Sequence, residues 1–235
     1  GAIFDAIEYD DIDELERLLD DLDDDDLDDF VNSPDEEGYS PLIVAASIGL
    51  VDIAEVLLES KAKINYIAPD HASALFCAVQ EKHWELVETL VEFNADLNAQ
   101  RDKGPTPLYI ASQEGYDDMV GHLVDIKADP DLRAHGITPL FIASQENHPG
   151  VTRALLQKKA DPNRRNKSGG LPIVVAAWRN NVKVLEHLVA CPEVKLDKFG
   201  GANMSALMTA CKNQKTESVK ILIEAKADLN KVMPD

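Results

Sequence analysis

The 235-residue sequence predicts an all-α solenoid of about seven helix–turn–helix repeats. Three observations lead to this prediction. A phrase suited to starting a helix returns six times at nearly constant spacing, a second phrase follows about 20 residues after each start, and aliphatic residues recur at helical spacing between them. Neither helix of such a unit buries its apolar face alone, so neighbouring repeats must stack to form a core.

The first phrase begins with Ser or Thr in five of its six copies, and proline or alanine follows. Its copies start at Ser40, Ser73, Thr106, Thr138, Leu171 and Ser205, which are 33, 33, 32, 33 and 34 residues apart. Ser or Thr caps a helix, and proline at the first helical position loses no hydrogen bond. Small residues then allow neighbouring helices to approach closely: Ala45, Ala46, Ala78, Ala111, Ala143, Ala176, Ala177 and Ala210.

A second helix follows in each repeat, with aliphatic residues such as Ile53, Val56 and Leu57 at helical spacing. The second phrase comes after it. Its copies begin at Ala62, Ala95, Ala128, Ala160, Val194 and Ala227. One residue inserted near Pro192 accounts for the single 34-residue gap.

A period near 33 with the pattern Thr-Pro-Leu-x-x-Ala resembles the ankyrin repeat, a turn and two antiparallel helices, over about residues 3–230. We predict one domain, 1–235, with a divergent N-terminal capping repeat at 3–34 and repeats at 35–67, 68–100, 101–132, 133–165, 166–199 and 200–235. The final residues look like the approach to a further turn, so we expect a fragment of a longer protein.

The sequence departs from this family where the second helix ends. The family usually has glycine there, in a left-handed conformation. This chain has Lys61, Asn94, Lys127, Lys159 and Lys226. Lysine beside the negative end of the helix dipole offsets part of a backbone cost of roughly 1 kcal/mol.

Charge is distributed very unevenly. Residues 1–40 contain 18 acids and one base, whereas the other 195 contain 25 acids and 22 bases. The net charge of −20 argues against direct binding to nucleic acid or to an anionic membrane, and no apolar run approaches the ~20 residues of a membrane span. Three scattered cysteines favour a reducing intracellular compartment, cytoplasmic or nuclear, and we expect a monomer.

The segment from Asp20 to Asp29 is predicted to be an extended, solvated acidic loop inserted at 20–29. Its carboxylates include Asp21, Asp23, Asp24, Asp25 and Asp26. Alternate aspartates resemble a calcium loop, but Asp26 stands in place of the required glycine and Asn32 in place of the final glutamate. The remaining alternative is a docking surface for a basic partner.

No catalytic constellation is found. The sequence lacks a phosphate-binding glycine loop, a nucleophile elbow and any zinc-ligand spacing, so we predict no enzyme activity, no cofactor and no metal. Cys77 and Cys211 are expected to be buried thiols. His83 and His148 lie at the junction of two helices, and we expect both to be structural.

The resemblance implies that partners contact the turn tips and the exposed side of the first helices, which form a concave face. By register these positions are Tyr39, Ile48, Gln80, Glu81, Phe93, Gln113, Glu114, Ile126, His135, Ile137, Gln145, Glu146, Trp178 and Arg179. Three Gln–Glu pairs would form an acidic ladder for a segment bearing Lys or Arg, or else a plain solvated surface. Trp178 and Arg179 are residue types typical of interface hot spots, unless the indole folds onto its own neighbouring repeat.

A basic cluster follows: Arg153, Lys158, Lys159, Arg164, Arg165, Lys167, Arg179 and Lys183, with only Asp161 opposing it. The alternatives are scattered surface charge and a polarity that orients a bipolar partner or promotes weak head-to-tail contacts.

We therefore predict a non-catalytic scaffold that binds a partner protein or peptide, one with basic residues, on its groove. One alternative is an adaptor or regulatory segment of a larger enzyme, channel or ligase. Another is an acidic mimic that occupies a basic, nucleic-acid-binding partner.

Overall fold

The computed structural model describes residues 1–20, 22–100 and 102–233, with the backbone alone at residues 24 and 25. Within these residues the regular structure comprises fifteen short α-helices and one 3-10 turn, with no strand beyond an isolated bridge between Ala134 and Ile137. The all-α repeat fold is thus confirmed. The chain divides into two compact units, Gly1–Ile110 and Ala111–Asp235, where the sequence predicts one domain.

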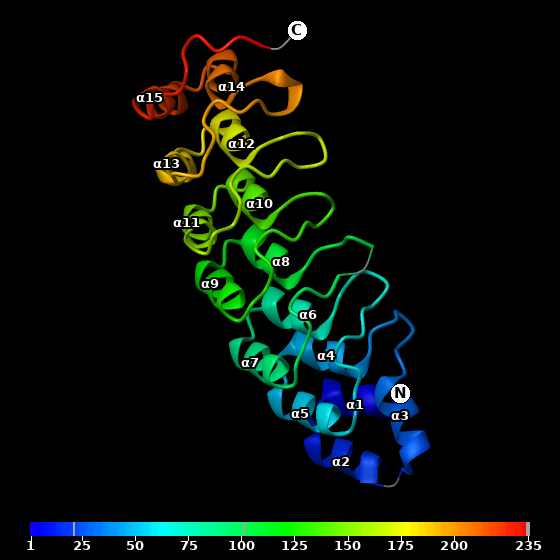
Figure 1. Cartoon of the computed structure of the whole chain (residues 1–235). Helices are drawn as coiled ribbons and strands as arrows, with labels where there is room; N and C mark the ends of the chain where they lie inside the picture. Colours follow the sequence, from blue (N-terminus) through cyan, green and yellow to red (C-terminus); the bar gives the residue numbers. More distant parts are fainter. Residues whose placement is uncertain (21, 101, 234–235) are drawn as a thin grey trace. The chain divides into compact units, whose positions relative to one another are not determined.

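The first unit contains two rows of helices. Its helices are α1 (Ala2–Glu8), α2 (Ile12–Asp20), α3 (Asp24–Asn32), α4 (Pro41–Ile48), α5 (Val51–Glu59), α6 (Ala74–Gln80) and α7 (Trp84–Glu92), and α8 (Pro107–Glu114) begins there. Helices α1, α4 and α6 pack in one row, and α2, α5 and α7 pack in the other (Figure 1). The pair α1–α2 occupies the segment assigned to the capping repeat.

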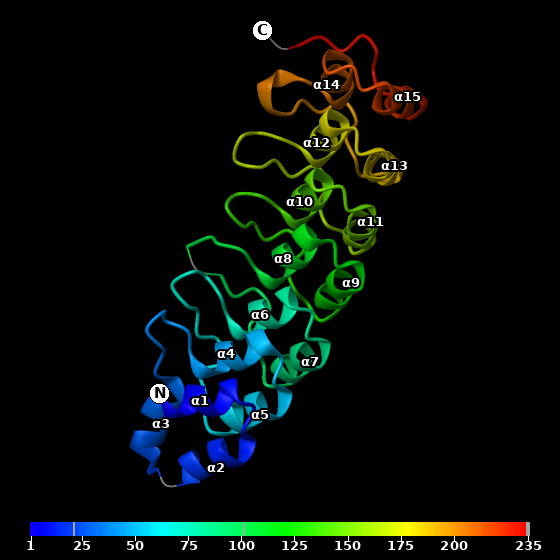
Figure 2. The same cartoon turned by 180° about the vertical axis from the view of Figure 1, so that it is seen from behind.

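The second unit repeats this two-row plan. It contains the end of α8, then α9 (Asp117–Asp125), α10 (Pro139–Gln145), α11 (Pro149–Gln157), α12 (Pro172–Arg179), α13 (Val182–Ala190), the 3-10 turn η1 (Gly201–Asn203), α14 (Ala206–Lys212) and α15 (Thr216–Glu224). The first helices α10, α12 and α14 pack in series, as do α9, α11, α13 and α15. The turns leading into α12 and α14 project from the first-helix row, as both views show (Figure 2).

The predicted caps begin five of the first helices. The hydroxyl oxygens of the five caps accept the N–H three residues later at 3.1–3.4 Å: Ser40, Ser73, Thr106, Thr138 and Ser205. Ala45, Ala111 and Ala176, from three different repeats, are fully buried. The predicted helix caps and the predicted close packing at the small residues are both confirmed.

The second helices α5, α7, α9, α11 and α15 end in a left-handed residue, as the resemblance implies, whereas α13 does not. The φ angles are 69° at Lys61, 65° at Asn94, 86° at Lys127, 65° at Lys159 and 66° at Lys226. The N–H of the next residue then bonds a carbonyl five residues back, from Ala62 to Leu57 for example, at 2.9 Å. This bond satisfies a carbonyl that the helix end would otherwise leave unpaired.

Within each unit, the last residue of the second phrase joins neighbouring repeats. In the first unit, the Asn65 side-chain oxygen accepts the backbone N–H of Asp96 at 2.7 Å. In the second unit, Asn163 accepts the N–H of Lys195 at 2.9 Å. These bonds fix the spacing of neighbouring repeats, and therefore of the first-helix ends that carry the candidate site.

Candidate partner-binding surface

The ends of two neighbouring first helices form a hollow in the second unit. Its volume is about 480 Å³, and it is lined by Gln113, Glu114, Ile142, Gln145, Glu146 and His148. The structure therefore brings together two of the three predicted Gln–Glu pairs. The third pair, Gln80 and Glu81, is exposed in the first unit.

Each Gln–Glu pair adopts the same internal contact. The glutamine Nε2 donates to the following glutamate carboxylate at 3.1 Å in Gln80–Glu81, 3.3 Å in Gln113–Glu114 and 2.7 Å in Gln145–Glu146. A carboxylate has about four acceptor sites, so each exposed glutamate keeps capacity for Lys or Arg donors.

A histidine from the next repeat holds the end of α8. The His148 Nε2 lies 2.8 Å from the backbone oxygen of Gln113, to which it donates. Its ring lies over Gly115, where φ is 78° and an added Cβ would lie 2.4 Å from the ring Nδ1. In the first unit, the Nε2 of His83 lies 3.3 Å from the backbone oxygen of Ser47. Both histidines therefore have structural roles.

An asparagine does the same at the end of α10. The Asn181 Nδ2 donates to the backbone oxygens of Ser144 at 2.9 Å and Gln145 at 3.2 Å. The hollow is thus backed on both sides by buried or half-buried side chains. Such support holds the surface in one conformation before a partner arrives.

An exposed aromatic residue follows at the end of α12, which packs beside α10. Trp178 is 49% exposed, and the guanidinium carbon of Arg179 lies 5.7 Å from the centroid of its ring. One face of the indole therefore contacts its own neighbour in the chain. About half of the residue remains accessible to a partner.

In the first unit the predicted partner-binding residues differ in their exposure to solvent. Ile48 is 48% exposed and Phe93 is 38% exposed. Tyr39 is half-buried, and its hydroxyl donates to Asp70 Oδ2 at 2.7 Å, which together with burial raises the pKa of Tyr39 to about 12. The Tyr39 hydroxyl therefore already joins two successive turns.

The remaining predicted positions lie at two turns of the second unit. Ile126 follows α9 directly and is half-buried, and His135 is exposed at the tip of the turn before α10. Ile137 is half-buried and exchanges backbone hydrogen bonds with Ala134 at 2.9 Å. Their contact with a partner remains a prediction.

The acidic segment is a helix where an extended loop was predicted. From Asp24 onward it forms α3, and the Asp23 Oδ1 accepts the N–H of Asp26 at 3.0 Å as the helix cap. Aspartates favour this helix because they lie near its positive N-terminus. Val31 is fully buried and anchors the other end. Asp21 and the side chains of Asp24 and Asp25 lie outside the described residues.

The basic cluster has more opposing carboxylates than Asp161 alone, which corrects the sequence prediction. Lys158 forms an ion pair with Asp125, and the Arg164 Nε lies 3.8 Å from Asp131 Oδ2. Both acids precede their partners by 33 residues, so they come from the previous repeat. The repeat period itself is the signal that identifies these pairs in the sequence.

The two first-helix cysteines differ from their prediction as buried thiols. Cys77 is half-buried, and burial, reinforced by the charges of Asp70 and Glu81, raises its pKa to about 12. Cys211 is exposed. Its equivalent Ala177 is fully buried because the next repeat covers it, whereas no helix pair follows α15 in the described residues.

The described residues contain no group of three or more His, Cys, Asp or Glu side chains that could hold a metal ion. In the same part of the chain, every helix is too short or too polar to cross a membrane.

Family comparisons agree with the repeat geometry. A model described as "Ankyrin repeats (3 copies)" matches residues 3–101 and 75–166, and one described as "Ankyrin repeat" matches residues 203–233. The chain belongs to the ankyrin-repeat family. Ankyrin repeats are general protein–protein interaction modules.

Solved structures show the same fold. The ankyrin repeat domain of Bcl-3, described as a unique member of the IkappaB protein family, matches with a TM-score of 0.83 at 20% sequence identity. The match covers 95% of this chain and 98% of that one. None of the curated proteins compared with the chain matches it significantly. At this identity the likeness concerns the fold alone.

Proposed function

We propose that the protein is a non-catalytic, monomeric scaffold that binds a partner protein or peptide along its first-helix ends. The observation that carries this proposal is the pre-formed surface of the second unit. There the hollow at Glu114 and Glu146 precedes the exposed Trp178–Arg179 pair on the adjacent first helix.

The chemistry of this surface selects the partner. Two exposed glutamates attract Lys or Arg, and the half-exposed indole offers apolar area to an aliphatic or aromatic side chain. His148 and Asn181 hold the backbone beneath, so little conformational entropy is lost on binding. The expected partner is an extended or helical segment with basic residues.

The test is affinity capture with the full chain from the source organism's lysate. One variant combines Trp178→Ala with Arg179→Ala, and a second combines Glu114→Gln with Glu146→Gln. We expect the first to lose the partner. The second should bind it more weakly and with less dependence on salt, because its neutral glutamines leave no charge pairs at these positions for salt to screen.

A matched control removes the same residue types elsewhere. Trp84 is 42% exposed and Arg153 is exposed, and both lie on second helices. The variant Trp84→Ala with Arg153→Ala should capture the partner normally. Loss of the partner with this control, or its retention by the Trp178/Arg179 variant, would disprove binding at the first-helix ends.

A further inference from the structure

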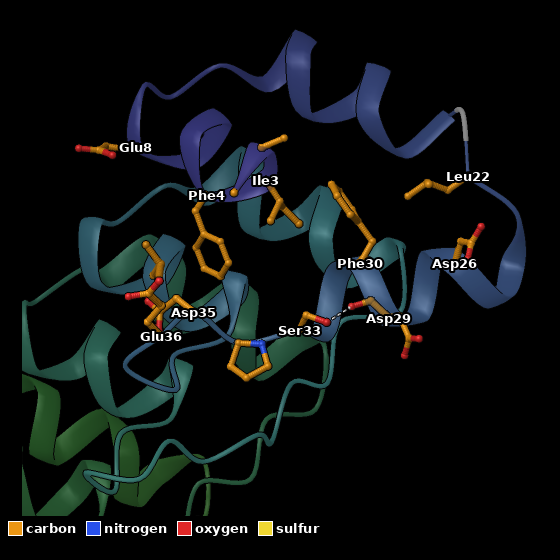
Figure 3. A pocket seen from close by; sticks show the side chains of 14 residues that line it. Ile3, Phe4, Glu8, Leu22, Asp26, Asp29, Phe30, Ser33, Asp35 and Glu36 are labelled. Atoms are coloured by element: carbon orange, nitrogen blue, oxygen red, sulfur yellow. Dashed lines mark hydrogen bonds between the residues drawn. The ribbon is translucent and has the colours of Figure 1, made fainter.

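The first unit contains a cavity that none of the predicted groove residues lines. It lies between α1, α3 and the turn that leads into α4, and its volume is about 880 Å³ (Figure 3). Ligand pockets in proteins span roughly 300–1,000 Å³, so this cavity has room for more than one side chain.

The floor of the cavity is apolar. Ile3 is buried, whereas Phe4 of α1, Phe30 of α3, Leu22 and Val44 are half-buried and keep part of their surface open to the cavity. Figure 3 shows the two phenyl rings on opposite sides of the space, with Ile3 between them. Covering such a surface with an apolar side chain is favourable, at roughly 25 cal/mol for each Å² removed from water.

The rim of the cavity is acidic. Five carboxylates line it: Glu8, Asp26, Asp29, Asp35 and Glu36. Asp35 accepts the backbone N–H groups of Glu37 and Tyr39. The other four are exposed and form no ion pair with any described cation.

The chain itself supplies little neutralising charge nearby, and Lys63, which comes from the next repeat, is paired with Asp28 of α3 at 3.3 Å. Arg17 is the one base among residues 1–40, and it pairs with Glu14 at 2.6 Å. An apolar floor with carboxylates along its edge therefore faces solvent in a region of excess negative charge. This excess negative charge repels nucleic acid and anionic lipid and attracts polypeptides rich in Lys and Arg.

We infer that this cavity is a second binding site, which takes a basic amphipathic polypeptide segment with its apolar side chains on the phenyl rings and its Lys or Arg residues at the rim. The inference does not depend on binding at the first-helix ends, because the two surfaces share no residue.

Labelled synthetic peptides and the full chain provide the test, read by fluorescence anisotropy. The main probe is a helical peptide of about four turns with leucine along one face and lysine on the other. Two comparison peptides replace every lysine with glutamate or every leucine with serine. We expect only the leucine–lysine peptide to bind, with an affinity that falls as salt is added.

Two triple variants distinguish the effect of the rim carboxylates on binding from the effect of net charge. Asp26→Asn, Asp29→Asn and Glu36→Gln remove three exposed charges at the cavity. The control Asp52→Asn, Glu55→Gln and Glu59→Gln removes three exposed charges from α5, and none of these residues lines the cavity. We expect about tenfold weaker binding with the rim variant and less than about a twofold change with the control.

A filled-cavity variant tests the apolar floor. Ala2 is exposed and lines the cavity, so Ala2→Trp places an indole there without removing a core side chain. We expect the leucine–lysine peptide to bind at least about tenfold less tightly. Hydrogen exchange should show protection of α1 and α3 when the peptide binds the unmodified chain.

Several results would overturn the inference. Equal loss of affinity in the two triple variants would mean that binding follows net charge alone. Equal binding of the serine and leucine peptides, or undiminished binding by Ala2→Trp, would exclude the apolar floor. Loss of binding with Trp178→Ala and Arg179→Ala would move the peptide to the other surface, and that result would leave the proposed function standing.

Discussion

At two repeats of the second unit, the residue just before the second helix holds the end of the previous repeat's first helix. His148 and Asn181 both donate to backbone oxygens of the previous repeat, although their side chains differ. We therefore expect His148→Asn to change the free energy of unfolding by only a few tenths of a kcal/mol, and His148→Ala to lower it by about 1–2 kcal/mol. Urea unfolding of both variants measures this difference. Equal effects from the two would show that the bond to Gln113 contributes nothing.

Asp131 is the last residue of the second phrase in its repeat. In two other repeats this position is Asn65 or Asn163, whose side-chain oxygen accepts a backbone N–H of the next repeat. Its side chain is 18% exposed, and it accepts the backbone N–H of Asp161 at 3.1 Å. Burial raises the pKa of Asp131, an effect that the Asp161 N–H and Arg164 only partly oppose. The folded state therefore holds this proton more tightly than the unfolded state. Ionisation costs stability as pH rises through the region above the ordinary aspartate pKa of about 3.9.

Asp131→Asn should accordingly raise the melting temperature at pH 7 and leave it nearly unchanged at pH 3. An amide keeps the acceptor oxygen and adds a donor, which at Asn163 bonds the backbone oxygen of Glu193 at 2.7 Å. The lost contact with Arg164 is partly exposed and long, so it contributes little. Thermal melts at the two pH values check the sign. A lower melting temperature at pH 7 would mean that the charge of Asp131 is stabilising.

Among the elements, the acidic helix α3 begins at a single side-chain cap. Asp23→Ala removes the acceptor for the Asp26 N–H and should lower the free energy of unfolding by about 1 kcal/mol. Asp23→Asn keeps an acceptor while removing the charge, so we expect stability near that of the original chain. Urea unfolding measures both, and hydrogen exchange localises the loss to α3. If the two variants behave alike, charge rather than capping governs this helix.

The conformation of α3 shows where prediction from sequence fails. Eight aspartates between residues 20 and 29 favour a solvated loop on composition. Leu27, Phe30 and Val31 nevertheless have the spacing of one helical face, and aspartate is favourable in a first turn. The cavity of the first unit follows from this helix, because Phe30 reaches the cavity from α3 and Phe4 from α1. Predicting residues 20–29 as a loop therefore leaves this cavity unpredicted.

Elements that repeat are predicted far better than contacts between them. Caps such as Thr138 and left-handed ends such as Lys159 depend on local chemistry, which each copy repeats. The pair Lys158–Asp125 joins two repeats and appears only when residues 33 positions apart are compared. The exposure of Cys211 depends on which repeat covers it rather than on its own position within the phrase. Local patterns thus determine the repeats, and stacking determines the surface.

At the scale of the whole molecule, charge is distributed unevenly along the chain. The first 40 residues have a net charge of −17 and the other 195 a net charge of −3. Acids of this segment form two ion pairs among the described residues, Glu14 with Arg17 and Asp28 with Lys63. Most of the repulsion among these carboxylates is therefore balanced only by solvent and salt, and it opposes folding of the first unit.

Raising NaCl from about 20 mM to about 300 mM shortens the Debye length from roughly 20 Å to roughly 6 Å, and should raise the melting temperature by about 2–4 °C. Asp10→Asn with Asp20→Asn should raise it at low salt and reduce this dependence, since both residues are exposed and Asp20 ends α2 at its negative pole. Thermal melts across the salt series measure both effects.

The matched control is Glu186→Gln with Glu224→Gln, two exposed acids of the second unit. Because the second unit has little net charge to screen, this variant should melt like the original chain at every salt concentration. If it flattens the salt dependence as much as the Asp10/Asp20 variant does, the repulsion is spread over the whole chain. Attraction of a basic peptide to the acidic rim would then come from the net charge of the chain rather than from the rim carboxylates.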